Sequence, residues 1–372
     1  MLFDAASQRS DVIRLEVGEP SDVTPAHIID AAARAARDGH TGYGPNGGLA
    51  SLRVLLSEKI ARVNGFRAEP DEIVVTPGGM NALYSTYLAL IDTGDEVLLP
   101  TPGFPNMDEM VRLVGGRPVF YELEASNGFL PDIERLDRLV TDHTKVLFIN
   151  TPANPTGAVF GADLMAALVE FAQRHDLWLV SDEVYDEMIL TPDAAHTSAA
   201  RFDEDGRVVT VFSFSKIYAM TGWRVGYVVA RGELAGMLRT LQEPQVSCPS
   251  TISQKGAEAA LTGPREPIQH MLEAYRRRRS LAIDAASVGE LEVIEPHGTL
   301  YMMLNTSAAG LPGLDFAMYL LDIHNVSVAP GTVFGPAGHS WIRISLAAAD
   351  DAVIEGVRRI GEAIRLRKAV SG

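Results

Sequence analysis

The chain has 372 residues, of which 47% are apolar and 22% are charged, and its formal net charge is −16. This is a globular composition, long enough for two or three domains, and its acidic balance argues against binding to nucleic acid or to an anionic membrane. The sequence has no secretory signal and no apolar stretch of the ~20 residues that a membrane helix needs. Its single cysteine, Cys248, permits no intrachain disulfide, which favours a reducing, cytoplasmic location.

Short apolar segments alternate with helical periodicity along much of the chain. In chain order, we expect strands at 73–76, 96–99, 117–122, 145–150, 177–181, 208–212 and 224–229, separated by helices at 81–91, 106–114, 133–141 and 163–175. Strands without polar alternation that are separated by helices predict a mostly parallel sheet covered on both faces. The predicted fold class is therefore α/β, with three α/β/α layers.

The pattern changes after about residue 232. Residues 258–285 are predicted to form one long helix, which carries four consecutive arginines at 276–279. In so acidic a chain the arginines indicate a solvated helix face rather than a nucleic-acid patch. From residue 291 the pattern predicts a smaller α+β unit. We expect a large domain over residues 31–275 and a small domain made of residues 1–30 and 276–372.

Chemically distinctive residues follow the predicted strands at their carboxyl ends. These residues are Gly78, Gly79, Asn154, Asp182 and Lys216. Each has an ordinary explanation on its own, such as a helix cap for an aspartate or a surface charge for a lysine. Ligands of open α/β sheets bind beyond the carboxyl ends of the strands, so the set together predicts one site.

The segment 213–226, SFSKIYAMTGWRVG, contains Lys216 with Arg224 eight residues later. It resembles the lysine signature of fold-type I, class I and II aminotransferases, which use pyridoxal 5′-phosphate (PLP). Other motifs of that family follow in order, namely GEP at 18–20, PGGMNA at 77–82, PGF at 102–104, NPTG at 154–157, SDEVY at 181–185, PGTVFG at 330–335 and IRIS at 342–345. The resemblance covers about residues 12–365. It implies a large PLP-binding domain and a smaller α+β domain.

The resemblance also implies roles at the cofactor ring. Lys216 would carry PLP as a Schiff base and later move a proton, with Asp182 and Tyr185 as the other catalytic residues. Asp182 would keep the pyridine nitrogen protonated. Tyr185 and Asn154 would hydrogen-bond the phenolate oxygen of the cofactor. Phe104 would stack on the ring.

The cofactor phosphate would lie at the start of a helix, where backbone N–H groups point outward. The residues implied there are Gly79, Met80, Asn81, Ser213, Ser215 and Arg224. Tyr43 would reach the phosphate of the neighbouring subunit, which implies a homodimer with shared active sites.

For the substrates, an amino acid and a 2-oxo acid, the resemblance implies that Arg343 binds the α-carboxylate as a bidentate fork, assisted by Gly18 and Asn154. Aspartate aminotransferases of the related prokaryotic subgroup commonly have lysine at the position of Met80. The methionine therefore favours an apolar or otherwise neutral substrate side chain. No metal site is expected, because the nine histidines show no metal-ligand spacing.

Two alternatives to an aminotransferase share the same motifs. A carbon–sulfur lyase would use the same lysine, aspartate, tyrosine and arginine, and the motifs barely separate it from an aminotransferase. A PLP-sensing regulator would carry a DNA-binding module ahead of this fold, and only about ten residues precede the region of resemblance. We therefore expect an enzyme, and an aminotransferase first.

Overall fold

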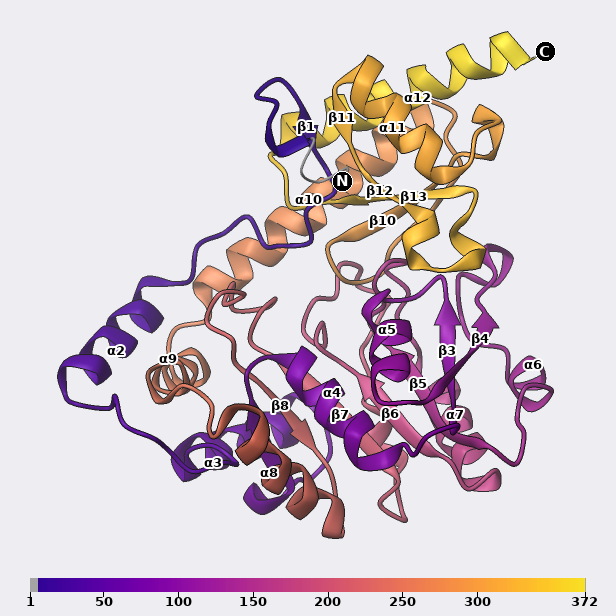
Figure 1. The fold of residues 1–372 in the computed structure, drawn as a ribbon. Coiled ribbons are helices and arrows are strands. Elements are labelled where there is room, and N and C mark those ends of the chain that lie inside the picture. Colours follow the sequence, from indigo (N-terminus) through magenta and orange to yellow (C-terminus); the bar gives the residue numbers. More distant parts are fainter. Residues whose placement is uncertain (1–5, 372) are drawn as a thin grey trace.

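A computed structural model of the chain describes residues 6–371 and places a seven-stranded sheet in the larger part of the molecule (Figure 1). The strand order is β2-β8-β7-β6-β5-β3-β4. The strands are β2 (Ile73–Thr76), β3 (Glu96–Thr101), β4 (Arg117–Glu122), β5 (Thr144–Asn150), β6 (Trp178–Asp182), β7 (Val208–Ser213) and β8 (Gly226–Val229). Within this sheet β8 runs antiparallel to both neighbours, and the other pairs are parallel. The predicted α/β class, with a mostly parallel sheet, is confirmed.

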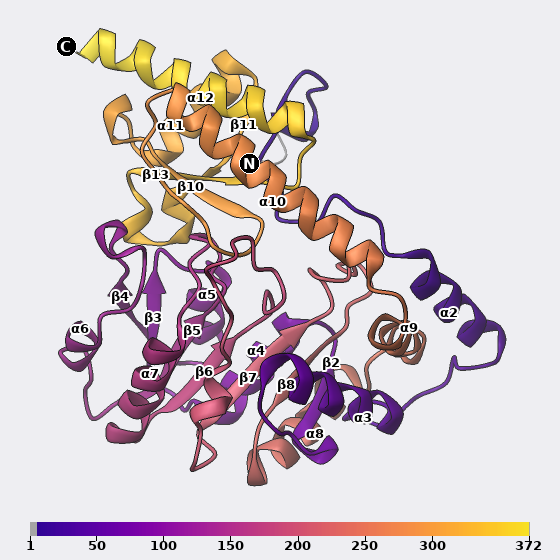
Figure 2. The same ribbon diagram turned by 180° about the vertical axis from the view of Figure 1, so that it is seen from behind.

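Helices cover both faces of this sheet because its central strands are apolar on both sides. In β5, Val146 and Phe148 pack on the face covered by α4 (Gly79–Leu90), α5 (Asn106–Leu113) and α8 (Gly232–Val246). Leu147 and Ile149 point the other way, toward α3 (Ala50–Lys59) and α7 (Ala162–Arg174). Figures 1 and 2 show these two helical layers from opposite sides. Each fully buried side chain of this size contributes about 1.5–3 kcal/mol to the free energy of folding.

The smaller part of the molecule is built on a four-stranded antiparallel sheet, in the order β12-β13-β10-β9. Its elements are β9 (Val293–Ile294), β10 (Tyr301–Asn305), β12 (Ala329–Pro330), β13 (Trp341–Ser345), α11 (Gly313–His324) and α12 (Asp350–Ser371). The N-terminal strand β1 (Ile13–Arg14) pairs with β11 (Val326–Ser327), so the beginning of the chain lies beside its C-terminal part. The helix α10 (Glu266–Val288) continues through the expected boundary at 275, and the domain division stays a prediction.

Two helix predictions were wrong in extent. The stretch 258–285 is not one helix, because α9 (Thr251–Thr262) ends at Gly263 before α10 begins. A Cβ at Gly263 would lie 2.4 Å from the Cδ2 atom of His27, and Pro264 cannot donate the next helical hydrogen bond. The helix expected at 133–141 is the short α6 (Ile133–Asp137).

A further helix, α2 (Ala26–Arg37), lies at the side of the molecule (Figure 1).

The four arginines of α10 make contacts within the protein. Arg277 and Arg278 both pair with Asp350, at the start of α12. Arg279 pairs with Glu295, at 2.8 Å. The run therefore ties α10 to neighbouring segments, and only Arg276 and Arg277 lie on the exposed face that was predicted for all four.

No helix of residues 6–371 combines the length and the apolar composition needed to cross a membrane. The two longest helices, α10 and α12, both carry several arginines and acidic residues along their length.

Candidate active site

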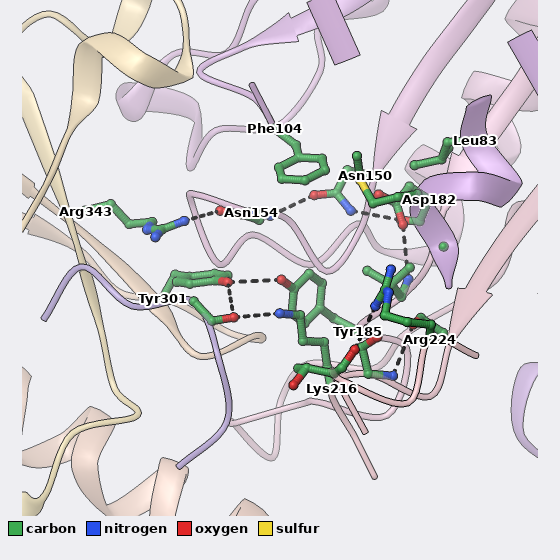
Figure 3. Close-up of a pocket in the computed structure, with 17 residues that line it drawn as sticks. Leu83, Phe104, Asn150, Asn154, Asp182, Tyr185, Lys216, Arg224, Tyr301 and Arg343 are labelled. Carbon is green, nitrogen blue, oxygen red and sulfur yellow. Dashed lines mark hydrogen bonds between the residues drawn. The ribbon is translucent and has the colours of Figure 1, made fainter. Parts of the chain in front are cut away.

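A cavity of about 330 Å³ opens at the carboxyl ends of β5, β6 and β7, and Tyr301 and Arg343 of the smaller part of the molecule also line it (Figure 3). It brings together most of the residues that the sequence predicted for a site. These are Gly18, Gly79, Met80, Phe104, Asn154, Asp182, Tyr185, Ser213, Ser215, Lys216, Arg224 and Arg343. We call the part around Asp182, Tyr185 and Lys216 the lysine end, and the part around Tyr301 and Arg343 the arginine end.

Two predicted residues do not line the cavity. The Asn81 side chain faces α8, where its amide groups bond Gln245, at 2.8 Å, and Gln242, at 3.1 Å. The Tyr43 side chain is 90% exposed, on the loop that follows α2. Asn81 was expected to contact the phosphate through its backbone N–H group, which does not depend on its side chain. Tyr43 was expected to contact the phosphate of a neighbouring subunit, so its role needs a dimer.

The topology of the sheet explains why the lysine end converges. Asp182 closes β6, and Lys216 follows the end of the parallel neighbour β7. Because β8 runs the opposite way, it starts where β7 ends, and Arg224 just before it returns to the same edge. Three segments that are separate in sequence thus present polar side chains at one edge.

Lys216 lies in the middle of the cavity. Its Nζ atom donates a 2.6 Å hydrogen bond to the Gly18 carbonyl and lies 6.0 Å from the ring centre of Tyr185. No carboxylate of residues 6–371 forms an ion pair with this amine, which is held instead by a neutral acceptor next to a tyrosine ring. Such an amine is placed to react with a ligand in the cavity.

Asp182 is a buried carboxyl group, with 3% of its surface exposed. It accepts a hydrogen bond from the Val184 backbone N–H, at 3.3 Å. Burial raises the pKa of Asp182 from its ordinary value of 3.8 to about 7, although this backbone bond and the nearby Lys216 favour the charged form. A carboxyl group in such surroundings favours a cationic partner, which suits a protonated ring nitrogen.

Asn150 lines the cavity and connects two strand ends. Its Nδ2 atom donates to the Asp182 backbone carbonyl at 3.0 Å, and its Oδ1 atom accepts from the Asn154 N–H at 2.7 Å. The positions of Asp182 and Asn154 are therefore coupled through one buried amide.

The start of α4 forms a concavity of uncapped backbone N–H groups beside Arg224, which we call the anion concavity. The helix begins after Gly78 without a side-chain cap, and Gly78 has φ 83°. A Cβ at Gly78 would lie 2.4 Å from an Arg224 guanidinium nitrogen, and one at Gly226 would lie 2.6 Å from the Gly79 nitrogen. The glycines thus allow a guanidinium and uncapped N–H groups to approach one another, as a phosphate requires.

Arg343 is a buried guanidinium, 7% exposed, that has no ion pair among residues 6–371. Its Nη1 atom donates to Asn154 Oδ1 and its Nη2 atom to the Glu16 carbonyl, each at 2.9 Å, while Nε has no partner. Burial lowers the pKa of Arg343, and nearby Tyr301, Tyr185 and Glu16 oppose that effect. A buried cation with a free N–H group fits an incoming carboxylate.

Tyr185 and Tyr301 form a pair of buried hydroxyl groups between the two ends (Figure 3). Tyr185 donates to the Tyr301 oxygen at 3.2 Å, and Tyr301 donates to the Gly18 carbonyl at 3.2 Å. Burial raises the pKa of Tyr185 well above its ordinary value. Burial acts the same way on Tyr301, but the charges of Lys216 and Arg343 outweigh it and hold the pKa of Tyr301 below its ordinary value.

The wall of the cavity nearest α4 is apolar. It is formed by Met80, Leu83, Phe104 and Val184, and the only cations lining the cavity within the described chain are Lys216, Arg224 and Arg343. The first two belong to the lysine end and the anion concavity.

Sequence reasoning missed five residues of the lining, namely Leu83, Asn150, Val184, Thr221 and Tyr301. Asn150 could have been found, because it closes a predicted strand, and Leu83 lies one helical turn after Gly79 and Met80. Tyr301 has no such signal, since it reaches the cavity only through the packing of the small sheet on the large one.

Comparisons with known proteins agree with this geometry. The family model described as Aminotransferase class I and II matches residues 10–360. An aspartate/prephenate aminotransferase of Thermus thermophilus is 36% identical over 360 residues, which cover 96% of this chain and 92% of the relative. An aspartate aminotransferase of Pyrococcus abyssi is 38% identical, over 99% of this chain and 95% of the relative.

A solved structure of an aromatic aminotransferase from Pyrococcus horikoshii superposes with a TM-score of 0.94 at 37% identity, covering 99% of this chain and 100% of the other. The Thermus thermophilus aspartate aminotransferase with maleate gives a TM-score of 0.93 at 36% identity, covering 97% and 94%. These relatives are aminotransferases, which confirms that interpretation over the lyase. The chain belongs to the class I and II aminotransferase family, whose members are PLP-dependent transferases.

Proposed function

We propose that this aminotransferase binds PLP in the cavity, with Lys216 as the amine that holds it covalently, and exchanges amino groups between an L-amino acid and a 2-oxo acid. When bound, PLP supplies an electron sink for negative charge at the substrate Cα. The buried Asp182 carboxyl group supports this proposal, because it lines the cavity and forms no ion pair with any residue of 6–371, so a protonated pyridine nitrogen would provide the cationic partner.

The chain's own groups divide the remaining work. The Lys216 Nζ atom, once free of the cofactor, would take the proton from the substrate Cα and deliver it to the cofactor carbon C4′. Tyr185 keeps its own proton, since burial raises its pKa. When PLP is bound, this proton would turn from the Tyr301 oxygen to the phenolate oxygen, which the Asn154 amide would also contact. Phe104 covers the ring face and excludes water.

The phosphate would lie at the start of α4, against the N–H groups of Gly79, Met80 and Asn81. Arg224, Ser213 and Ser215 would complete this binding site. The Ser213 oxygen already accepts the Ser215 N–H at 3.1 Å, which orients the turn that precedes Lys216.

We further propose a homodimer in which Tyr43 reaches the phosphate in the neighbouring subunit. This tyrosine is 90% exposed and lies on the loop that follows α2, so it is accessible to a second subunit. A solution mass of one chain, with full cofactor affinity, would contradict the dimer. The single cysteine is compatible with a cytoplasmic location, which remains part of the proposal.

One observation carries the substrate assignment. Arg343 is buried without a carboxylate partner among the described residues, and it points into the cavity from the side opposite Asp182 (Figure 3). It would bind the substrate α-carboxylate, with the Asn154 amide and the Gly18 backbone beside it.

The substrate side chain is proposed to be apolar or otherwise neutral. Met80 and Leu83 line the cavity near α4, and the cations of the lining are already assigned to the cofactor and the α-carboxylate. Several relatives are named aspartate aminotransferases, so the preference for aspartate over leucine or phenylalanine is the point to measure. A high kcat/KM for aspartate relative to these amino acids would contradict the proposal.

The test is a half-reaction with the PLP-loaded protein and one amino acid at a time. Loss of the visible absorption of the bound cofactor, with one equivalent of 2-oxo acid and no ammonia, is the expected result and names the donor. Continuous release of ammonia would contradict it. A protein that never acquires visible absorption would show that Lys216 does not hold the cofactor.

A further inference from the structure

Tyr301 contacts groups from both ends of the cavity. Its ring lies beneath the Arg343 guanidinium, whose Cζ atom is 4.1 Å from the ring centre. Its hydroxyl group accepts from Tyr185 and donates to the Gly18 carbonyl, both at 3.2 Å. The same carbonyl accepts the 2.6 Å hydrogen bond from Lys216. One side chain therefore joins the carboxylate-binding arginine to the surroundings of the reactive lysine.

The backbone holds Tyr301 in this position. It is the first residue of β10, paired with Ser345 of β13, and 2% of its surface is exposed. On the facing segment, a Cβ at Gly18 would lie 2.6 Å from the Tyr301 hydroxyl oxygen. Residue 18 must therefore lack a side chain for this hydroxyl group to reach the N-terminal backbone.

The contacts of the hydroxyl group differ from those of an ordinary core tyrosine. A buried hydroxyl group needs hydrogen-bond partners, and a purely structural one would find them in the surrounding core. Both partners of Tyr301 belong to the cavity lining instead. A phenylalanine would fill the same apolar space without this desolvation cost, so packing alone does not account for the oxygen.

We infer that Tyr301 is a positioning residue with two separable parts: its ring holds the Arg343 guanidinium in place, and its hydroxyl group holds the Gly18 carbonyl. The inference rests on the proposed function. The ring acts on binding of the substrate carboxylate, because a desolvated cation over an aromatic face is stabilised in one orientation. The hydroxyl group acts on proton transfer, because the Gly18 carbonyl is the acceptor that orients the Lys216 amine.

Two substitutions separate these parts. Tyr301→Phe keeps the ring and removes the hydroxyl group, whereas Tyr301→Leu removes both. Tyr319→Phe is the matched control, because Tyr319 is a half-buried tyrosine of α11 that does not line the cavity. Each variant is loaded with PLP, and its thermal midpoint is checked against that of the unsubstituted protein.

Two quantities are measured for each variant. The first is the dissociation constant of 3-phenylpropionate, a carboxylate that has no amino group and therefore cannot react. The second is kcat and KM with one amino donor. We expect Tyr301→Phe to bind 3-phenylpropionate as tightly as the unsubstituted protein and to lose about tenfold in kcat. We expect Tyr301→Leu to lose about tenfold in 3-phenylpropionate affinity as well.

Each part of the inference can be overturned separately. A Tyr301→Phe variant with unchanged kcat would overturn the role of the hydroxyl group. A Tyr301→Leu variant with unchanged affinity for 3-phenylpropionate would overturn the role of the ring. If the unsubstituted protein itself does not bind 3-phenylpropionate, the proposed carboxylate site at Arg343 is overturned, and this inference with it.

Discussion

The lysine end of the cavity is built from neighbouring strand ends of one sheet, whereas the arginine end is assembled from separate stretches of chain. Asp182 and Lys216 follow β6 and β7, which are hydrogen-bonded neighbours. At the arginine end, Arg343 and Tyr301 come from β13 and β10, and Gly18 comes from the N-terminal segment. The lysine end therefore follows from the strand order of one sheet, whereas the arginine end depends on how the small sheet and the N-terminal segment pack on the large sheet. Substitutions at the lysine end should therefore change the chemistry, and those that remove the Arg343 guanidinium or the Tyr301 ring should change affinity for the substrate carboxylate.

The largest effect is expected from Lys216→Ala. Removal of the amine eliminates both covalent attachment and the proton carrier at the Cα atom, so kcat should fall by about 10⁴-fold or more. PLP should still bind through Asp182 and the start of α4, as equilibrium dialysis can measure. The control is Lys368→Ala, an exposed lysine near the end of α12. Turnover close to that of the unsubstituted protein would contradict the proposed mechanism.

Asp182→Asn tests the lysine end through stability. Burial raises the pKa of Asp182 from 3.8 to about 7 in the folded chain. Between these pH values the folded cofactor-free protein keeps a proton that the unfolded chain releases, so its stability should fall by about 4 kcal/mol as pH rises through this window. The asparagine variant should lack this fall. Denaturant unfolding near pH 4 and near pH 8 measures the difference.

The exposed Asp284 of α10, changed to asparagine, is the matched control for that experiment. It should keep the pH dependence of the unsubstituted protein. An equal pH dependence in the Asp182→Asn variant would show that the titrating group lies elsewhere.

Arg343→Ala tests the arginine end. Loss of a buried charge pair with the substrate carboxylate should reduce kcat/KM, mostly through a higher KM. The loss corresponds to about 2–5 kcal/mol of transition-state stabilisation. Arg343→Lys keeps the charge but cannot contact Asn154 and Glu16 at the same time. Its kcat/KM should therefore lie between that of Arg343→Ala and that of the unsubstituted protein. Arg358→Ala, on the exposed face of α12, is the control. A loss confined to kcat would contradict carboxylate binding by Arg343.

Met80→Lys should have the smallest effect and sharpens the specificity proposal. A lysine at this apolar wall offers a charged partner to an acidic side chain, and such hydrogen bonds contribute about 1.5–3 kcal/mol. The kcat/KM ratio of aspartate to leucine should therefore rise by about 10–100-fold. Met237→Lys, at an exposed methionine of α8, should leave the ratio unchanged. An unchanged ratio in Met80→Lys would mean that substrate side chains do not approach this wall.

The regular elements were predictable where local signals were strong. The bounds expected for β2 and β4 agree with the structure, because turn residues flank β-branched or aromatic runs there. The prediction of one helix at 258–285 was wrong because helical periodicity was followed through Gly263 and Pro264, which end α9.

The sequence by itself determined the chemistry at strand ends and the family, since Lys216, Asp182 and Arg224 lie in motifs with fixed spacing. Only the tertiary structure decided which distant groups meet. Tyr301 reaches Gly18 and Tyr185 across two sheets, and no local pattern encodes that contact. The environment of Arg343, buried and without a carboxylate partner among the described residues, likewise depends on where the N-terminal segment packs. Periodicity and motifs report on neighbours along the chain, whereas burial, pKa and convergence depend on neighbours in space.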